Sequence, residues 1–157
     1  MLSRPVVKDI GEIITLIWQN QPLVIAISAL VIAQVLKGLT YYFKEKKIDF
    51  RHLVSTGGFP SSHTAMVCAL ATAVGLQNGW ASPLFALAFV FASIVMYDAA
   101  GVRRAAGKQA RILNQIMEDV LSKGHFPGEK LTELLGHTPF EVFAGFVLGI
   151  FIAYIMY

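Results

Sequence analysis

The stretch PSSHTAMVCALATAVGLQNGWASPLFALAFVFASIVMY, residues 60–97, decides the fold of this chain. It holds two apolar runs, residues 61–77 and 80–97, on either side of the short turn Asn78-Gly79. A helix needs about 20 mostly apolar residues to cross a bilayer, so each run is predicted to span a membrane, the first one marginally. Two further apolar runs complete four predicted spans: residues 22–43 and 139–157.

The composition agrees with one membrane domain. The 157 residues are 55% hydrophobic, with a mean hydropathy of +0.60. A soluble all-α protein is the alternative, but four near-continuous apolar runs exceed what a core of this size needs. We therefore expect an all-α membrane protein in which residues 1–157 form a single domain, with the bilayer and no nucleic acid as partner. The lone Cys68 excludes an internal disulfide.

The basic residues set the predicted orientation. They gather after the first and third spans, whereas the turn Asn78-Gly79 has none. The positive-inside rule then places both long connections in the cytoplasm and both termini outside. We expect a multi-pass protein of the cell membrane. The basic residues of the two connections are Lys44, Lys46, Lys47 and Arg51, then Arg103, Arg104, Lys108, Arg111, Lys123 and Lys130.

Segments outside the spans also show helical patterns. Apolar residues from Ile10 to Trp18 recur at helical spacing, which predicts an interfacial helix before the first span. Residues 111–123 have one apolar and one polar face and stop at Gly124, and residues 129–135 suggest a second short helix. We expect these two helices to lie on the inner membrane surface or to cover a site as a lid, with simple packing as the alternative.

Two glycines in the last span form a small-xxx-small pattern. Gly145 and Gly149 are four residues apart, and such spacing permits close contact between membrane helices. The pattern predicts packing within the chain, with a homodimer interface as the alternative.

The sharpest local signal for chemistry is Gly57-Gly58-Phe59-Pro60-Ser61-Ser62-His63. Glycines suit an entry turn, proline suits the first turn of a helix, and serines suit an N-cap. Unpaired amides at a helix N-terminus favour an anion, the serine hydroxyls add donors, and His63 would project towards the bound group. A well-capped helix with an incidental interfacial histidine is the alternative.

A second candidate motif is His137-Thr138-Pro139-Phe140-Glu141. A helical turn could bring the Glu141 carboxylate to the His137 imidazole, where it would fix the tautomer and support positive charge on the ring. The alternative is a capping box, in which Thr138 and Glu141 satisfy the backbone and Pro139 is the first helical residue. Taken alone, the motif favours the capping box.

Three further cations lie near or just after the ends of predicted spans. Lys37 lies near the end of the first, and Arg103 and Arg104 follow the third, where charge that sets topology is the alternative explanation. Guanidinium groups match phosphate oxygens bidentately. Up-down connectivity would bring these cations and both histidine motifs to one membrane face, which indicates a phosphate site. No metal cluster of convincing spacing is visible, and no cofactor is expected.

This combination resembles the type-2 phosphatidic acid phosphatase superfamily, and especially its divergent branch of small bacterial and plastid proteins. Its motifs are Lys-x6-Arg-Pro, Pro-Ser-Gly-His and Ser-Arg-x5-His-x3-Asp. Pro60-Ser61-Ser62-His63 matches the second, with Ser62 where glycine is usual, and His137 with Glu141 matches the end of the third, with glutamate in place of aspartate. Two departures stand out: Lys44-Glu45 replaces Arg-Pro after Lys37, and over thirty residues separate Arg103 and Arg104 from His137.

The resemblance implies a metal-independent lipid-phosphate phosphatase. His137 would be the nucleophile that forms a phosphohistidine, Glu141 would orient it, and His63 would protonate the leaving alcohol. The phosphate would be bound by cations, hydroxyls and amides. The residues expected to bind it are Lys37, Ser61, Ser62, and Arg103 or Arg104.

The predicted orientation favours an inner-leaflet substrate such as phosphatidylglycerophosphate or phosphatidic acid. A reversed topology would instead favour a polyprenyl diphosphate. A non-catalytic protein that binds phospholipid headgroups is the alternative from another class, motivated by the departures at Lys44 and at the arginines. A small transporter is a third alternative, disfavoured because no span carries a charged residue near its middle.

Overall fold

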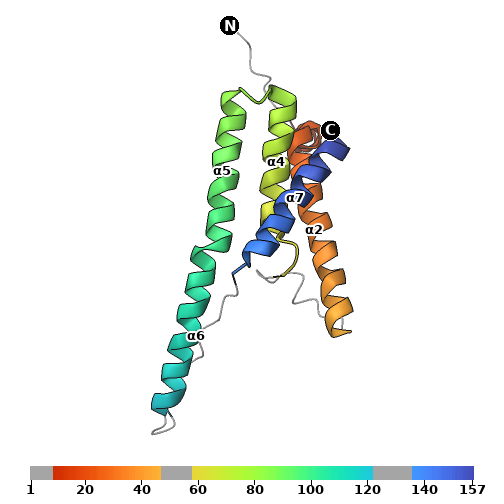
Figure 1. The fold of residues 1–157 in the computed structure, drawn as a ribbon. Helices are drawn as coiled ribbons and strands as arrows, with labels where there is room; N and C mark the ends of the chain where they lie inside the picture. Colours follow the sequence, from red (N-terminus) through yellow and green to blue (C-terminus); the bar gives the residue numbers. More distant parts are fainter. Residues whose placement is uncertain (1–8, 47–57, 122–135) are drawn as a thin grey trace.

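The computed structural model describes residues 9–46, 58–121 and 136–157, and within these ranges every regular element is an α-helix (Figure 1). The fold class predicted from the sequence is therefore confirmed. The elements are α1 (Ile10–Gln19), α2 (Gln21–Glu45), α4 (Ser62–Asn78), α5 (Pro83–Ala100), α6 (Val102–Leu121) and α7 (Pro139–Met156).

The predicted spans correspond to α2, α4, α5 and α7. Gln21–Phe43, Pro139–Met156 and the helical stretch that starts at Pro83 are long and apolar enough to cross a membrane. The 17 residues of α4 rise only about 25 Å, so this helix is the marginal one, as expected.

Helix α4 lies at the centre of the bundle and contacts α2, α5 and α7 (Figure 1). Its small side chains pack on two sides. Ala69 and Ala73 join a cluster with residues of α2 and α7, and Ala71 joins a second cluster with Ala92 of α5. Small residues suit such a helix because membrane helices gain stability from close van der Waals packing.

The glycines of the small-xxx-small pattern form the contact between α7 and α4. A Cβ atom at Gly145 would collide with the carbonyl oxygen of Ser61, and one at Gly149 would collide with that of Ala65. The pattern is therefore a packing surface within the chain, as the first of the two interpretations predicted.

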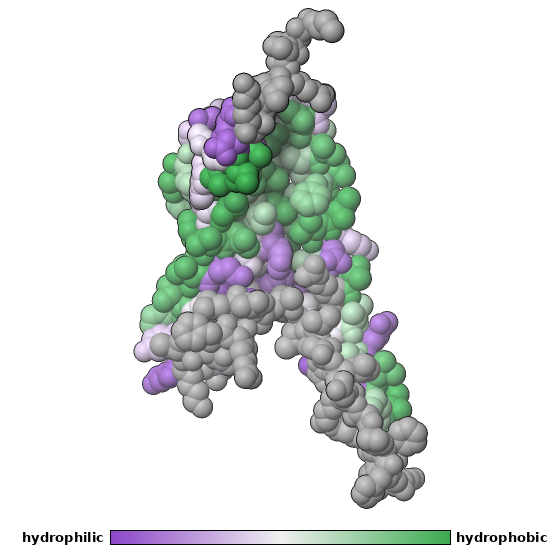
Figure 2. Space-filling view, turned by 180° about the vertical axis from the view of Figure 1, so that it is seen from behind, coloured by the Kyte–Doolittle hydropathy of each residue, from purple (hydrophilic) through white to green (hydrophobic). Residues whose placement is uncertain are grey.

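The end of the bundle opposite the histidine motifs carries α1 and the C-terminus (Figure 1). Helix α1 has no buried residue, and its apolar side chains are exposed, as an interfacial helix requires. Asn20 separates it from α2, because the Asn20 side chain accepts a hydrogen bond from the Leu23 amide. On the surface in Figure 2, apolar residues cover most of the bundle, and hydrophilic residues gather at its lower end, between two apolar flanks.

Helix α6 differs from the expectation for the third connection. It begins directly after Gly101 and continues nearly in line with α5, away from the bundle (Figure 1). Among the described helices it contacts only α5, so it does not cover the histidine motifs as a lid. Its sequence lacks a strong stop after α5, because Gly101 alone does not end a helical pattern. The second predicted helix, residues 129–135, lies outside the described residues.

Candidate functional site

The first turn of α4 is shaped by the residues that precede it. Gly58 has a φ of +114°, a conformation that glycine adopts readily, and the Phe59-Pro60 peptide is cis. Ser61 is the N-cap: its hydroxyl accepts a hydrogen bond from the Thr64 amide at 3.4 Å and lies 2.9 Å from Thr64 Oγ1. The predicted serine cap is confirmed, but Pro60 precedes the cap instead of lying in the first turn.

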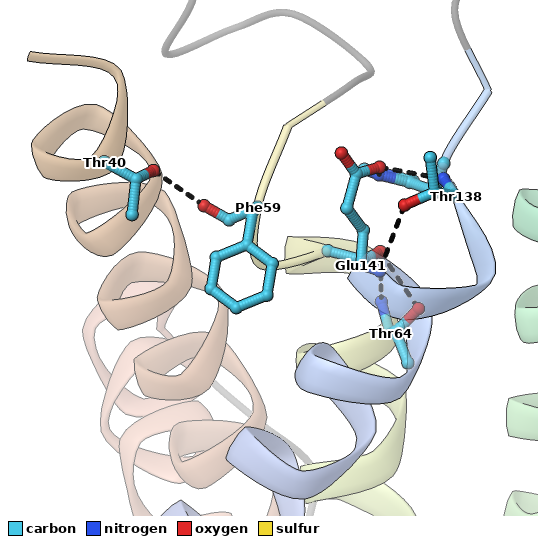
Figure 3. Close-up of polar contacts among 7 residues, drawn as sticks. Thr40, Phe59, Thr64, Thr138 and Glu141 are labelled. Atoms are coloured by element: carbon cyan, nitrogen blue, oxygen red, sulfur yellow. Dashed lines mark hydrogen bonds and ion pairs between the residues drawn. The ribbon is translucent and has the colours of Figure 1, made fainter. Parts of the chain in front are cut away.

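The Glu141 carboxylate fulfils both of the roles that the sequence offered as alternatives. Thr138 N donates to Glu141 Oε2 at 2.9 Å, and Glu141 N donates to Thr138 Oγ1 at 3.3 Å, which is a capping box (Figure 3). The same Oε2 lies 3.2 Å from His137 Nδ1. His137 is only 2% exposed. A carboxylate at Nδ1 favours the tautomer in which Nε2 is the nucleophilic ring atom.

The two histidine motifs are joined through their backbones. The amide of Ser61 donates to the carbonyl oxygen of Glu141 at 3.0 Å. Alongside this bond, the rings of Phe59 and Phe140 stack with centroids 5.4 Å apart and planes inclined by 14°. The N-termini of α4 and α7 therefore meet, and the predicted gathering of both motifs at one end of the bundle is confirmed.

Lys37 of α2 reaches the same place. It is 4% exposed, and a Cβ atom at Gly58 would lie 2.8 Å from Lys37 Cε, so the loop backbone packs on the lysine stem. Its ammonium is within range of electrostatic attraction to the Glu141 carboxylate. One turn later, Thr40 Oγ1 lies 2.9 Å from the carbonyl oxygen of Phe59, to which it donates (Figure 3). Helix α2 thus fixes the loop before α4.

The serines and His63 differ in their surroundings. Ser61 is fully buried, with its amide and hydroxyl already hydrogen-bonded, and Ser62 is 3% exposed. His63, one residue further along α4, has an exposed side chain. The first turn of α4 also supplies amides that have no carbonyl partner within the helix. An exposed imidazole beside buried hydroxyls suits a group that exchanges protons with a ligand or with water.

The arginines lie in the first turn of α6, and their side chains are outside the described part of the structure. The binding of phosphate by Arg103 or Arg104 therefore stays a prediction. The same holds for Lys44 as a substitute for the arginine of the Lys-x6-Arg-Pro motif. The end of α5 is nevertheless attached to the site, because the amide of His137 donates to the carbonyl oxygen of Ala99 at 3.2 Å. The arginines follow Ala99 by about one helical turn.

Three contributors were missed in the sequence: Thr40, Thr64 and Ala99. Thr64 had a local signal, since a hydroxyl three residues after a serine cap lies on the same face of the helix. Thr40 and Ala99 contribute through contacts with residues distant in the chain, and no local sequence pattern predicts such contacts.

The chemistry of this end of the bundle suits an anion. Two helix N-termini and the buried Lys37 supply positive potential around the Glu141 carboxylate, and the imidazoles of His63 and His137 lie at the same end of the bundle. Among the residues that the structure describes, no group of three or more His, Cys, Asp or Glu side chains is placed to hold a metal ion. The donors at this end of the bundle are of the kind that binds anions.

Comparison with known proteins identifies a family and a relative. Residues 18–152 match the family described as "Divergent PAP2 family". The chain is also similar to "Uncharacterized membrane protein YuiD" of Bacillus subtilis (strain 168), with 43% identity over 148 residues, which covers 87% of this chain and 94% of the relative. No solved structure matches the chain. The family match includes every residue of the site described above.

Proposed function

This chain belongs to the Divergent PAP2 family, and from that membership we propose that it is a membrane phosphatase that hydrolyses a lipid phosphate through a phosphohistidine. The observation that carries the proposal is the His137–Glu141 pair, which is held against the N-terminus of α4. This pair supplies an oriented imidazole, and the helix N-terminus supplies amides for the phosphate.

In the first step His137 Nε2 attacks phosphorus in line with the ester oxygen. The N–P bond forms as the P–O bond to the lipid alcohol breaks, and His63 gives its proton to the departing oxygen. In the second step water attacks phosphorus, His63 takes a proton from that water, and the N–P bond breaks to release inorganic phosphate. Glu141 stabilises the positive ring of His137 throughout.

Charge stabilisation falls to the groups around the phosphoryl oxygens. Lys37, the Ser62 hydroxyl and the amides of the first turn of α4 are the donors near at hand, and Arg103 or Arg104 adds a guanidinium. Phosphoryl transfer depends mainly on positioning and on such electrostatic stabilisation. The attraction between Lys37 and Glu141 supports this assignment, because it places the lysine at the same histidine motif.

The proposed site faces the cytoplasm, and the proposed substrate is an inner-leaflet lipid such as phosphatidylglycerophosphate or phosphatidic acid. The basic connections that follow α2 and α5 support this orientation. Among the described residues, three helices long and apolar enough to cross a membrane support a multi-pass location.

The test is phosphate release by the purified protein from both lipids, with no divalent metal added. His137→Ala should lower kcat at least about 1,000-fold, as loss of a nucleophile does in other covalent mechanisms. With a labelled phosphate, the wild type should also hold label on His137, and Asn78→Ala at the far end of α4 should leave the rate unchanged. Activity that persists in His137→Ala would sink the mechanism.

Non-catalytic binding of phospholipid headgroups is the second candidate. The type-2 phosphatidic acid phosphatase motif has Arg-Pro where this chain has Lys44-Glu45. This departure favours headgroup binding, because Lys44-Glu45 lacks the guanidinium that a phosphatase would use. Binding of either lipid without turnover, unaffected by His63→Ala, would support this candidate over the phosphatase.

A further inference from the structure

Gln34 places an amide inside the membrane-spanning part of α2. Its Oε1 atom is buried and has no hydrogen-bond partner within the part of the chain that the structure describes. A buried acceptor without a partner is costly, all the more so in a bilayer, where water is scarce. Polar side chains inside membrane spans therefore commonly mark the path or the binding site of a ligand.

The position of Gln34 relates it to the site. It precedes Lys37 by three residues, and residues at this spacing are neighbours on one side of a helix. Because α2 runs towards the histidine motifs, Gln34 lies on the bilayer side of Lys37, with a rise between them of about 4.5 Å. In Figure 2 one group of hydrophilic residues lies between the two apolar flanks of the bundle, and another group lies at its upper end.

We propose that Gln34 Oε1 accepts a hydrogen bond from the lipid substrate, from a hydroxyl on the carbon next to the one that carries the phosphate. The inference rests on the proposed function, which puts the phosphate at Lys37. The body of a lipid extends from its phosphate towards the bilayer, so the neighbouring carbon reaches the level of Gln34. The buried Gln34 Oε1 atom needs a hydrogen-bond donor, and a hydroxyl of the lipid would supply it.

This chemistry distinguishes the two candidate substrates. Phosphatidylglycerophosphate carries a free hydroxyl on the carbon adjacent to its terminal phosphate ester. Phosphatidic acid carries an acyl ester at that carbon, which has no proton to donate. A site that hydrogen-bonds a hydroxyl rejects a ligand without it, because the buried acceptor stays unpaired. The proposed substrate is therefore the hydroxyl-bearing lipid.

The test compares kcat/KM for the two lipids in the same detergent micelles. The wild type should prefer phosphatidylglycerophosphate, and Gln34→Met, which keeps the shape but removes the acceptor, should reduce that preference about tenfold. Gln34→Glu keeps an acceptor and should keep the preference. Val35→Met, on the exposed lipid-facing side of α2, is the matched control. A ratio of rates is insensitive to the fraction of protein that misfolds.

An unchanged ratio in Gln34→Met would overturn the inference, and so would a wild type that prefers phosphatidic acid. Binding of both lipids to the His137→Ala protein gives the same ratio without turnover. If the wild type releases no phosphate but binding still depends on Gln34, the phosphatase fails and the hydroxyl site stands. If phosphate is released from both lipids and Gln34→Met leaves the ratio unchanged, the phosphatase stands and the hydroxyl site fails.

Discussion

The backbone amide of Ser61 donates a hydrogen bond of 3.0 Å to the carbonyl oxygen of Glu141, although eighty positions separate the two residues in the chain. Each residue belongs to one of the two histidine motifs. Because both partners are backbone atoms, the contact fixes the relative position of two helix N-termini whatever the side chains do. The imidazole of His137 thereby acquires a defined position against α4.

Glu141→Gln should separate the two roles of this side chain. Glutamine can still complete the capping box, so the free energy of unfolding should change by less than about 1 kcal/mol. The neutral amide no longer supports positive charge on His137, and kcat should fall about 100-fold or more. Thr138→Ala is the converse variant: it should lower stability by about 1 kcal/mol and affect kcat less. Wild-type turnover in Glu141→Gln would contradict the role given to the carboxylate.

Lys37→Met should abolish most activity without unfolding the protein. The substitution keeps the apolar stem that packs on Gly58 and removes the charge near Glu141. Loss of one donor to the transition state typically lowers kcat about 100- to 1,000-fold. Lys46→Met, in which an exposed lysine just after α2 is changed, is the control and should behave as wild type. Equal losses in both variants would indicate a general effect of charge.

Gly145→Ala should push α4 and α7 apart. The new methyl group would collide with the Ser61 carbonyl oxygen, which is backbone and cannot rotate away. Overpacking of this kind typically costs about 1–3 kcal/mol, measurable as a lower thermal midpoint in detergent. Val147→Ala, on the exposed side of the same helix, should have little effect. A Gly145→Ala protein with unchanged stability would mean that the two helices are not tightly packed there.

Ser61→Ala should mainly lower stability, whereas Ser62→Ala should mainly lower kcat. The Ser61 hydroxyl caps α4 and contacts Thr64, so its loss should lower stability by about 1 kcal/mol with a modest effect on kcat. Ser62 is not the cap, and its loss should lower kcat with little change in stability. Thermal unfolding and phosphate release on the same preparations would check both. A stable Ser61→Ala protein with the larger loss of kcat would reverse the assignment.

Most of the fold could be predicted from the sequence because the spans are nearly pure apolar runs with clear punctuation. The predicted start of the last span at Pro139 agrees with α7, and the serine cap of α4 was located from its residue type. The small-xxx-small pattern also predicted packing within the chain, although it did not identify α4 as the partner helix. The in-line continuation of α6 was not predicted, because helical periodicity reports a face and not the direction of the axis.

The site was predictable as a set of residues but not as a set of contacts. His137, Glu141 and Lys37 were found from their types and spacing, whereas the attachment of His137 to Ala99 joins residues with no mutual sequence signal. The sequence alone offers the capping box and the contact with His137 as alternatives for Glu141 only if its carboxylate has one partner. A carboxylate oxygen has more than one lone pair, and here Oε2 accepts from the Thr138 amide while facing His137 Nδ1.

The bond between Ala99 and His137 joins the end of α5 to the residue just before α7, although 37 positions lie between the two residues in the chain. Their number is thereby uncoupled from the placement of the imidazole. We expect insertions or deletions between these two positions to leave the His137 imidazole in place. In the sequence, over thirty residues separate Arg103 and Arg104 from His137. In the structure, one hydrogen bond nevertheless joins His137 to Ala99, which precedes these arginines by about one helical turn.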